Sequence, residues 1–181
     1  MQTSQYVMAA TLCIFGWNTH AGHVLWQTNA EGDDIHLVDA DTLQVVDRIV
    51  VGPNPHGIAA GDRQETIFVT LERNGAKTGE LLWIDPQTQI VEHRMEIGPE
   101  PHALAVTPDG RWAYVPCKDE HYWVVDTQKR AVVARIRTGG RPHNTSISPD
   151  GRRAYLSPMG RRARVTAVSY THLTLPTSFL V

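Results

Sequence analysis

The feature that most constrains the fold of this chain is an internal repeat of 41 to 46 residues. A Pro-His pair recurs at Pro55-His56, Pro101-His102 and Pro142-His143, with spacings of 46 and then 41 residues. A second marker, an apolar run that ends on aspartate, keeps the same two spacings. Its three aspartates are Asp39, Asp85 and Asp126. Because two independent markers keep one register, the chain is expected to repeat a single structural unit.

Each unit is expected to form four short antiparallel strands. In the clearest unit these are His102–Thr107, Arg111–Pro116, Tyr122–Val125 and Ala131–Arg137, and Pro108-Asp109-Gly110 supplies the first turn. The last strand alternates between apolar and polar side chains, which is typical of a strand with one solvated face. No part of the repeat region keeps a helical period for three turns. Four strands in roughly 40 residues is the blade of a β-propeller.

The larger of the two spacings contains an insertion. Its five extra residues fall within Leu71–Glu80, where Asn74-Gly75 is a strong turn signal. The sequence therefore predicts an enlarged surface hairpin in this unit.

The repeated sequence motifs resemble the YVTN-type β-propeller repeat. Ala113-Tyr114-Val115, Ala154-Tyr155-Leu156 and Ile67-Phe68-Val69 occupy the place of the Tyr-Val pair of that repeat, and Thr28-Asn29 keeps its Thr-Asn. The resemblance extends from about His23 to Val168. It implies an all-β fold, a β-propeller with four-stranded antiparallel blades, of which about three to four are present out of an expected seven.

Two departures from the repeat fall at turns or edges. Gly61-Asp62-Arg63 replaces Pro-Asp-Gly in one unit, and Pro116-Cys117 replaces Thr-Asn in the next. They are expected to weaken individual hairpins and to leave the fold assignment intact.

The chain divides into three expected parts: residues 1–22 as a signal peptide, 23–168 as a partial propeller, and 169–181 as a non-native tail. Val7 to Trp17 is an apolar run of 11 residues, and Thr19-His20-Ala21 resembles a cleavage site, although no Lys or Arg precedes Arg48. A cleaved signal implies a periplasmic or secreted protein. The alternatives are a misassigned start codon and an extra buried strand.

The end of the chain matches none of the repeat units. SYTHLTLPT, within Ser169 to Val181, resembles translated sequencing-adapter read-through, so the chain is expected to be a fragment of a longer propeller. The alternative is a divergent terminal strand.

Three histidines are the candidate binding residues. His56, His102 and His143 each begin the first strand of a unit, and in a propeller these first strands line the central channel. They are expected to form a ring at one channel mouth and to be cofactor-binding residues, because neutral imidazole binds copper, zinc and haem iron well. The alternative is that each histidine fills a repeat position and bonds the loop of a neighbouring blade.

Other chemically notable residues are assigned structural roles. The repeat aspartates lie a full unit apart, which favours turn capping over acid–base catalysis. Cys117 is expected to pack in the core. The sequence contains no Ser-His-Asp order, phosphate-binding glycine loop or Cys-x-x-Cys, so no catalytic residue is assigned.

Composition narrows the expected partners. Seventeen Lys and Arg residues nearly balance nineteen Asp and Glu, which gives no electrostatic reason for nucleic acid binding. The apolar run near the N-terminus is about half as long as a membrane span. The first hypothesis is a binding scaffold that takes a small molecule or protein at the channel mouth. The second is a redox propeller using the histidine ring, and copper or haem is expected only in that case.

Overall fold

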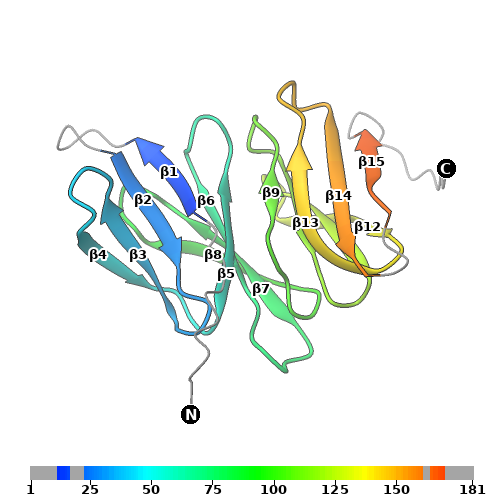
Figure 1. Cartoon of the computed structure of the whole chain (residues 1–181), viewed down its shortest axis with the longest axis horizontal. Coiled ribbons are helices and arrows are strands. Elements are labelled where there is room, and N and C mark those ends of the chain that lie inside the picture. Colours follow the sequence, from blue (N-terminus) through cyan, green and yellow to red (C-terminus); the bar gives the residue numbers. More distant parts are fainter. Residues whose placement is uncertain (1–11, 17–22, 161–163, 170–181) are drawn as a thin grey trace, which may run out of the picture.

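The computed structural model describes residues 12–16, 23–160 and 164–169. These residues form four antiparallel sheets. They contain no helix, and therefore no helix that could cross a membrane. The sheets follow one another along the chain and fan out across the molecule (Figure 1). Three of the sheets have four strands and one has three within the described residues, which confirms the expected all-β fold of a partial β-propeller.

The strands of each blade are consecutive in sequence and in space. Blade 1 comprises β1 (Leu12–Gly16), β2 (His23–Thr28), β3 (Asp34–Asp39) and β4 (Val45–Val50). Blade 2 comprises β5 (Pro55–Ala60), β6 (Ile67–Leu71), β7 (Gly79–Ile84) and β8 (Val91–Ile97). Blade 3 comprises β9 (Ala105–Val106), β10 (Trp112–Pro116), β11 (His121–Asp126) and β12 (Ala131–Arg137). Blade 4 comprises β13 (Arg141–Ile147), β14 (Arg153–Met159) and β15 (Thr166–Ser169).

The two ends of the chain are described only in part. β1 pairs with β2 and supplies the first strand of blade 1, within the segment for which an export signal is predicted. The remainder of that segment, residues 1–11 and 17–22, and residues 170–181 of the predicted non-native tail lie outside the described residues. Cleavage, export and the foreign origin of the tail therefore stay predictions.

One strand is shorter than the sequence predicts. The sequence predicts a first strand over His102–Thr107, but β9 contains only Ala105 and Val106. β9 pairs with β10 at Ala105 and Val106, and continuing that register would bring Pro116 into the ladder. The carbonyl of Pro116 accepts a hydrogen bond from the N–H of His102 at 2.9 Å, but proline has no N–H to donate in return, so the regular ladder does not extend to this residue.

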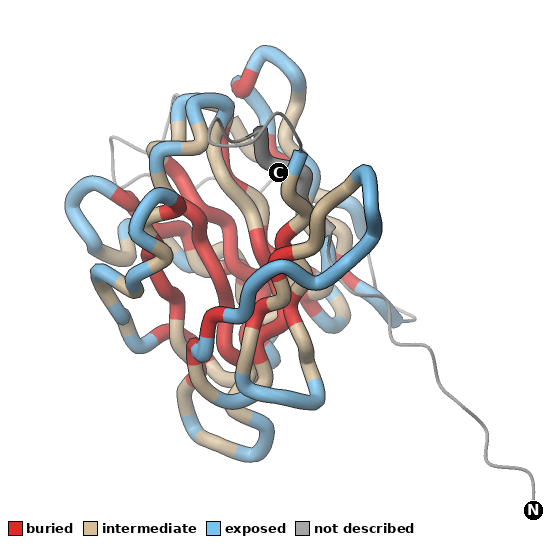
Figure 2. Tube along the Cα trace, turned by 90° about the vertical axis from the view of Figure 1, so that its left-hand side faces the viewer, coloured by how far each residue is buried: buried red, intermediate tan, exposed pale blue. Residues whose placement is uncertain are grey.

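The core consists of three buried clusters, each between two neighbouring blades. The first joins Trp26, Ile35 and Leu37 of blade 1 to Ile58 and Ile67 of blade 2, among others. The second lies between blades 2 and 3, and the third between blades 3 and 4. Figure 2 shows buried residues along the central strands and exposed residues on the connecting loops. Blade-against-blade packing therefore supplies the apolar burial of the fold.

The inner strands of successive blades lie beside one another, β1 next to β5, β5 next to β9, and β9 next to β13. Gly57 in β5 lies at a close approach of two of these strands. A Cβ atom at this position would lie 2.7 Å from the carbonyl oxygen of His102 and 2.9 Å from the amide nitrogen of Leu104. Only a residue without a side chain allows the backbones of blades 2 and 3 to come this close.

Gly57→Ala is therefore expected to destabilise the protein by about 1–3 kcal/mol, because the added methyl group must displace backbone atoms of blade 3. Urea unfolding measures the change. Gly32→Ala is the matched control, since its Cβ would meet nothing closer than 3.4 Å, and it is expected to change stability by less than about 0.5 kcal/mol. Equal effects of the two substitutions would contradict this account of the inner strands.

Candidate functional site

The three repeat histidines lie where the inner strands begin. His56 is in β5 and His143 in β13, and His102 lies just before β9. The β5–β6 register shifts between Pro55 and Ile58, and the β13–β14 register shifts between Arg141 and Asn144. Each irregularity spans the histidine. A bulge at this point bends the strand and redirects the side chain from the blade face.

The structure brings the three imidazoles together. The ring centroids of His56 and His102 lie 3.8 Å apart, and those of His102 and His143 lie 4.0 Å apart. His102 is therefore packed between the other two rings. The expected clustering of the repeat histidines at one end of the inner strands is present in three successive blades, while cofactor binding stays a prediction.

Two threonine hydroxyls fix the backbone of the first two histidines. Thr28 in β2 donates a hydrogen bond to the carbonyl oxygen of His56 at 2.7 Å. Thr70 in β6 donates to the carbonyl oxygen of His102 at 2.9 Å and accepts from the Gly57 N–H at 2.8 Å. Each hydroxyl belongs to the blade that precedes its histidine. The side chains thus project from backbone that is bonded across the blade boundary.

Blade 3 departs from this pattern because Pro116 stands where the threonine would be. The hydroxyl of Tyr122 in β11 takes over the role for the next histidine. It accepts a hydrogen bond from the N–H of His143 at 3.1 Å and donates to the carbonyl oxygen of Asn144 at 3.2 Å. Where Pro116-Cys117 replaces Thr-Asn, a tyrosine hydroxyl in place of a threonine hydroxyl therefore makes the hydrogen bonds between blades 3 and 4.

A fourth residue, Glu72, belongs to the cluster and was missed by the sequence analysis. Its Oε1 lies 3.9 Å from Nε2 of His56 and 3.9 Å from Nε2 of His102. It follows β6 at the start of the enlarged hairpin, and its N–H bonds the carbonyl of Asn54 at 2.9 Å. We call His56, Glu72, His102 and His143 the mouth cluster.

The comparison of repeat units does not point to Glu72, because the equivalent positions of the other units hold different residues. The corresponding places hold Ala30 in blade 1, Lys118 in blade 3 and Met159 in blade 4. The order of the strands does indicate its position. Glu72 directly follows β6, the antiparallel partner of β5, so it lies at the same end of the sheet as His56, which is near the start of β5.

Burial controls the charge of these groups. Desolvation lowers the pKa of His56, and it lowers the pKa of His102 to about 3, with the neighbouring histidines acting in the same direction. Desolvation, and then Glu100, raise the pKa of Glu72 to about 7, against the opposing effect of Arg141. The 3.9 Å separations resemble ion pairs, but two neutral imidazoles beside a carboxyl group form no ion pair at neutral pH.

The cluster also holds unsatisfied polar atoms. Nδ1 of His56 and Nδ1 of His102 are buried without a hydrogen-bond partner among the described residues. An unmade buried hydrogen bond costs folding free energy. The mouth cluster is therefore a place where the fold carries polar groups that its own packing does not use.

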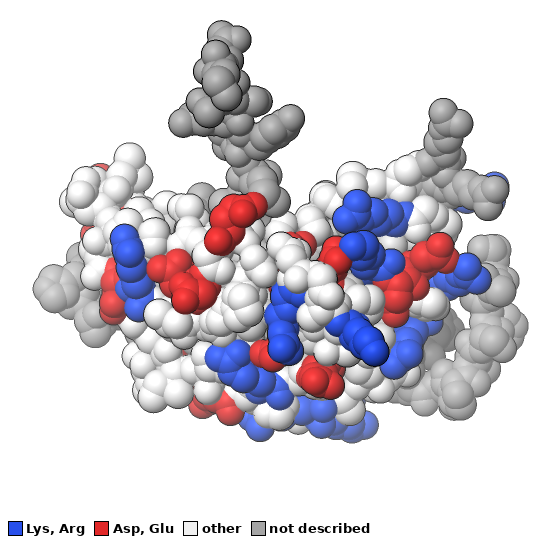
Figure 3. Space-filling model, turned by 90° about the horizontal axis from the view of Figure 1, so that it is seen from below, with Lys and Arg blue, Asp and Glu red and all other residues white. Residues whose placement is uncertain are grey.

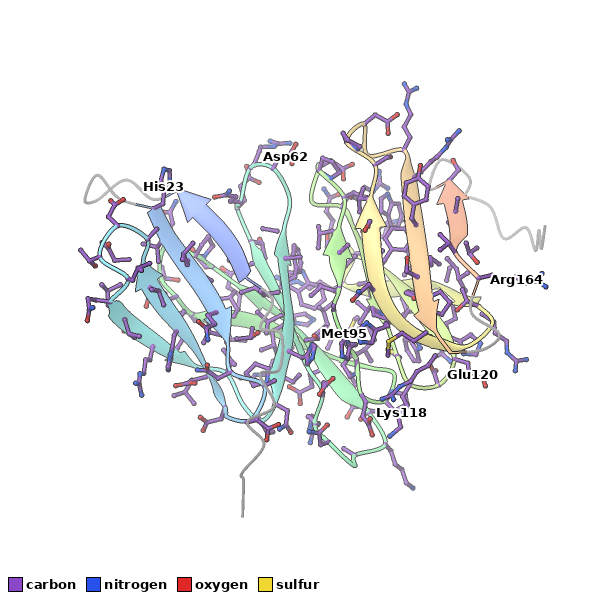
Figure 4. The ribbon with its side chains drawn as sticks, in the orientation of Figure 1. His23, Asp62, Met95, Lys118, Glu120 and Arg164 are labelled. Carbon is purple, nitrogen blue, oxygen red and sulfur yellow. The ribbon has the colours of Figure 1, made fainter. Side chains whose placement is uncertain are left out.

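The surroundings of the cluster carry both signs of charge. Lys118 and Glu120 lie on the lower side of the molecule in Figure 4, and Lys118 contacts Glu100 at 2.5 Å. Figure 3 shows acidic and basic side chains interspersed over this side. A shallow cleft of about 240 Å³ lies instead near Asp62, at the upper side in Figure 4, between Arg63, Glu65, Phe68, Trp83, Glu92 and Arg130. None of the repeat histidines lines it.

The repeat aspartates cap turns and Cys117 packs in the core, as the sequence predicts. Oδ1 of Asp39 accepts from the N–H groups of Asp41 and Thr42 at 3.0 and 2.7 Å, and Asp85 and Asp126 bond their own turns in the same way. Cys117 is buried in the cluster between blades 2 and 3, where burial raises the pKa of its thiol. Turn capping and core packing are thus confirmed for these residues.

The comparisons with known proteins agree with this architecture. No protein-family model and no curated protein matches the chain. The chain is similar to a chain of Kuenenia stuttgartiensis hydrazine synthase, with a TM-score of 0.71 and 24% identity over 83% of this chain and 44% of that one. It is similar to the Dos1 propeller, with a TM-score of 0.71 and 12% identity over 94% of this chain and 46% of that one.

The chain therefore spans less than half the length of each of these structures. At such identities the likeness shows the fold alone, which is a β-propeller. Fold and site together define a class: a propeller in which adjacent inner strands begin in a cluster of histidines. Membership of the YVTN-type repeat family stays a prediction.

Thr70→Val tests the attachment of His102. The substitution keeps the shape of the side chain but leaves the Gly57 N–H and the His102 carbonyl without partners, so we expect a loss of about 1–3 kcal/mol in urea unfolding. Thr70→Ser, which retains the hydroxyl, is expected to cost about 1 kcal/mol or less. A Val variant as stable as the Ser variant would show that the hydroxyl does not hold the two blades.

Proposed function

We propose that this chain is part of an exported β-propeller that binds a small ligand or a partner at its channel mouth, through the mouth cluster. The observation that carries the proposal is the meeting of His56, Glu72 and His102, whose side-chain ligand atoms all lie within 4.8 Å of one another. These polar groups are largely buried, and they come from two different blades.

The energetic cost of the cluster supports a binding role. Neighbouring inward positions could be apolar, as Ile58 and Leu104 are, and would then add to the core at no polar cost. Instead, the fold buries a carboxyl group among imidazoles with unpaired nitrogens. Polar groups left unsatisfied by the protein are available to a ligand, and strongly perturbed pKa values gather at functional sites.

The export component rests on the sequence. The apolar run from Val7 to Trp17 and the small residues around Ala21 support a cleaved signal, which would deliver the propeller to the periplasm or the medium. Cleavage after Ala21 would remove β1, so that blade 1 of the mature protein would begin at β2. The second candidate function, a metal- or haem-assisted redox propeller, is favoured by one observation: three imidazoles are in ring contact, and imidazole is a ligand for copper and haem iron.

A thermal-shift panel tests binding at the mouth. The purified chain is mixed separately with zinc chloride, copper(II) chloride, haemin, sodium phosphate and sodium acetate. At least one probe is expected to raise the unfolding temperature of the parent, because a ligand that binds only the folded state stabilises it. The shift is expected to disappear in the triple variant His56→Ala, His102→Ala, His143→Ala.

The control replaces three histidines outside the cluster, His36, His93 and His121, with alanine, and it is expected to keep the shift. A panel without any shift in the parent, or one in which both triple variants respond like the parent, would contradict binding at the mouth cluster.

A further inference from the structure

We infer that Nε2 of His56, Oε1 of Glu72 and Nε2 of His102 form a binding site for one divalent d-block cation, with Zn²⁺ as its representative. The inference rests on the proposed function and deepens it, because it names the class of ligand that the mouth cluster takes.

The distances suit a small metal ion. The carboxylate oxygen lies 3.9 Å from Nε2 of each histidine, and one ligand atom from each of the three residues lies within 4.8 Å of the other two. Ligand atoms of a tetrahedral zinc site, with bonds of about 2.0–2.2 Å, lie about 3.4 Å apart. Closing onto a metal thus requires side-chain movements of about half an ångström to one ångström, which ordinary torsional adjustment supplies.

The donor atoms select the type of metal. Two imidazole nitrogens favour zinc, copper or nickel, whereas calcium and magnesium prefer sites built from oxygen. A neutral imidazole has the nitrogen lone pair that a metal needs. Two histidines and one glutamate is a ligand set of open zinc sites, in which a fourth position is left for water or a substrate.

The backbone holds the ligands before any metal arrives. Thr28 fixes the carbonyl of His56, Thr70 fixes that of His102, and the N–H of Glu72 bonds Asn54. The three side chains are largely buried, with exposed fractions of 8%, 13% and 23% for His56, Glu72 and His102. A site held in this way loses little conformational entropy when the metal binds.

The neighbouring charges that act on Glu72 are of both signs. Glu100 and Glu31 act on Glu72 as negative charges, against Arg141 and Lys118, and Lys118 is itself paired with Glu100. A divalent ion would neutralise the buried carboxylate. His143 packs against His102 but contributes no atom to the three-membered group, so it is assigned no bond to the metal.

Zinc binding to the full chain tests the site. The chelator-treated protein is titrated with zinc chloride by calorimetry, and bound zinc is counted by mass spectrometry after dialysis. The parent is expected to bind one zinc ion per chain. Glu72→Gln and His102→Gln, which keep most of the side-chain volume, are each expected to weaken binding at least tenfold.

Two matched variants leave the site intact. Glu80→Gln changes a carboxylate of the same hairpin that is bonded to Arg73 and Arg94, and His93→Gln changes a histidine on the outer strand β8. Both are expected to bind zinc like the parent. Failure of the parent to bind zinc, or equal binding by Glu72→Gln, would overturn the inference.

The unfolding temperature gives a second readout, because zinc that binds only the folded state stabilises it. Without metal, Glu72→Gln is expected to unfold at a higher temperature than the parent, because it removes a buried carboxylate. With zinc the order is expected to reverse. If Glu72→Gln still unfolds at a higher temperature than the parent in the presence of zinc, the result would contradict the site. Stabilisation of the parent by haemin or phosphate, and not by zinc, would overturn the metal assignment and leave binding at the mouth cluster standing.

Discussion

Blades 2 and 3 each bury apolar side chains on both faces, and each of these faces is removed from water by a neighbouring blade. The three buried clusters lie between blades 1 and 2, 2 and 3, and 3 and 4, so the stability of a blade depends on its neighbours. Gly57 lets the inner strands of blades 2 and 3 approach to backbone contact. The positions of all inner residues follow from this packing.

The same packing accounts for the mouth cluster. Inner strands that lie side by side place equivalent residues side by side, so a histidine repeated in successive units becomes a row of imidazoles. The hydroxyls of Thr28, Thr70 and Tyr122 bond the histidine-bearing segments across blade boundaries. A residue outside the repeat, Glu72, then joins the row from the end of β6. Duplication supplies the histidines, and a single departure from it supplies the carboxylate.

The sequence predicted the blade architecture because its two markers recur in one register and each unit has its own turn residues. It also placed His56, His102 and His143 together, since their position within the unit is the same. It missed Glu72, because a residue present in one unit leaves no periodic signal, and its contact with two histidines depends on how adjacent blades pack. It overestimated the first strand of blade 3, because the effect of Pro116 depends on its pairing partner.

In the inferred metal site, blade packing brings together ligands from two blades. An anomalous difference map, recorded at the zinc edge from crystals of the zinc-loaded chain, tests it most directly. One peak is expected within about 2.2 Å of His56 Nε2, Glu72 Oε1 and His102 Nε2. A peak bound elsewhere, or no peak at the mouth cluster, would contradict it.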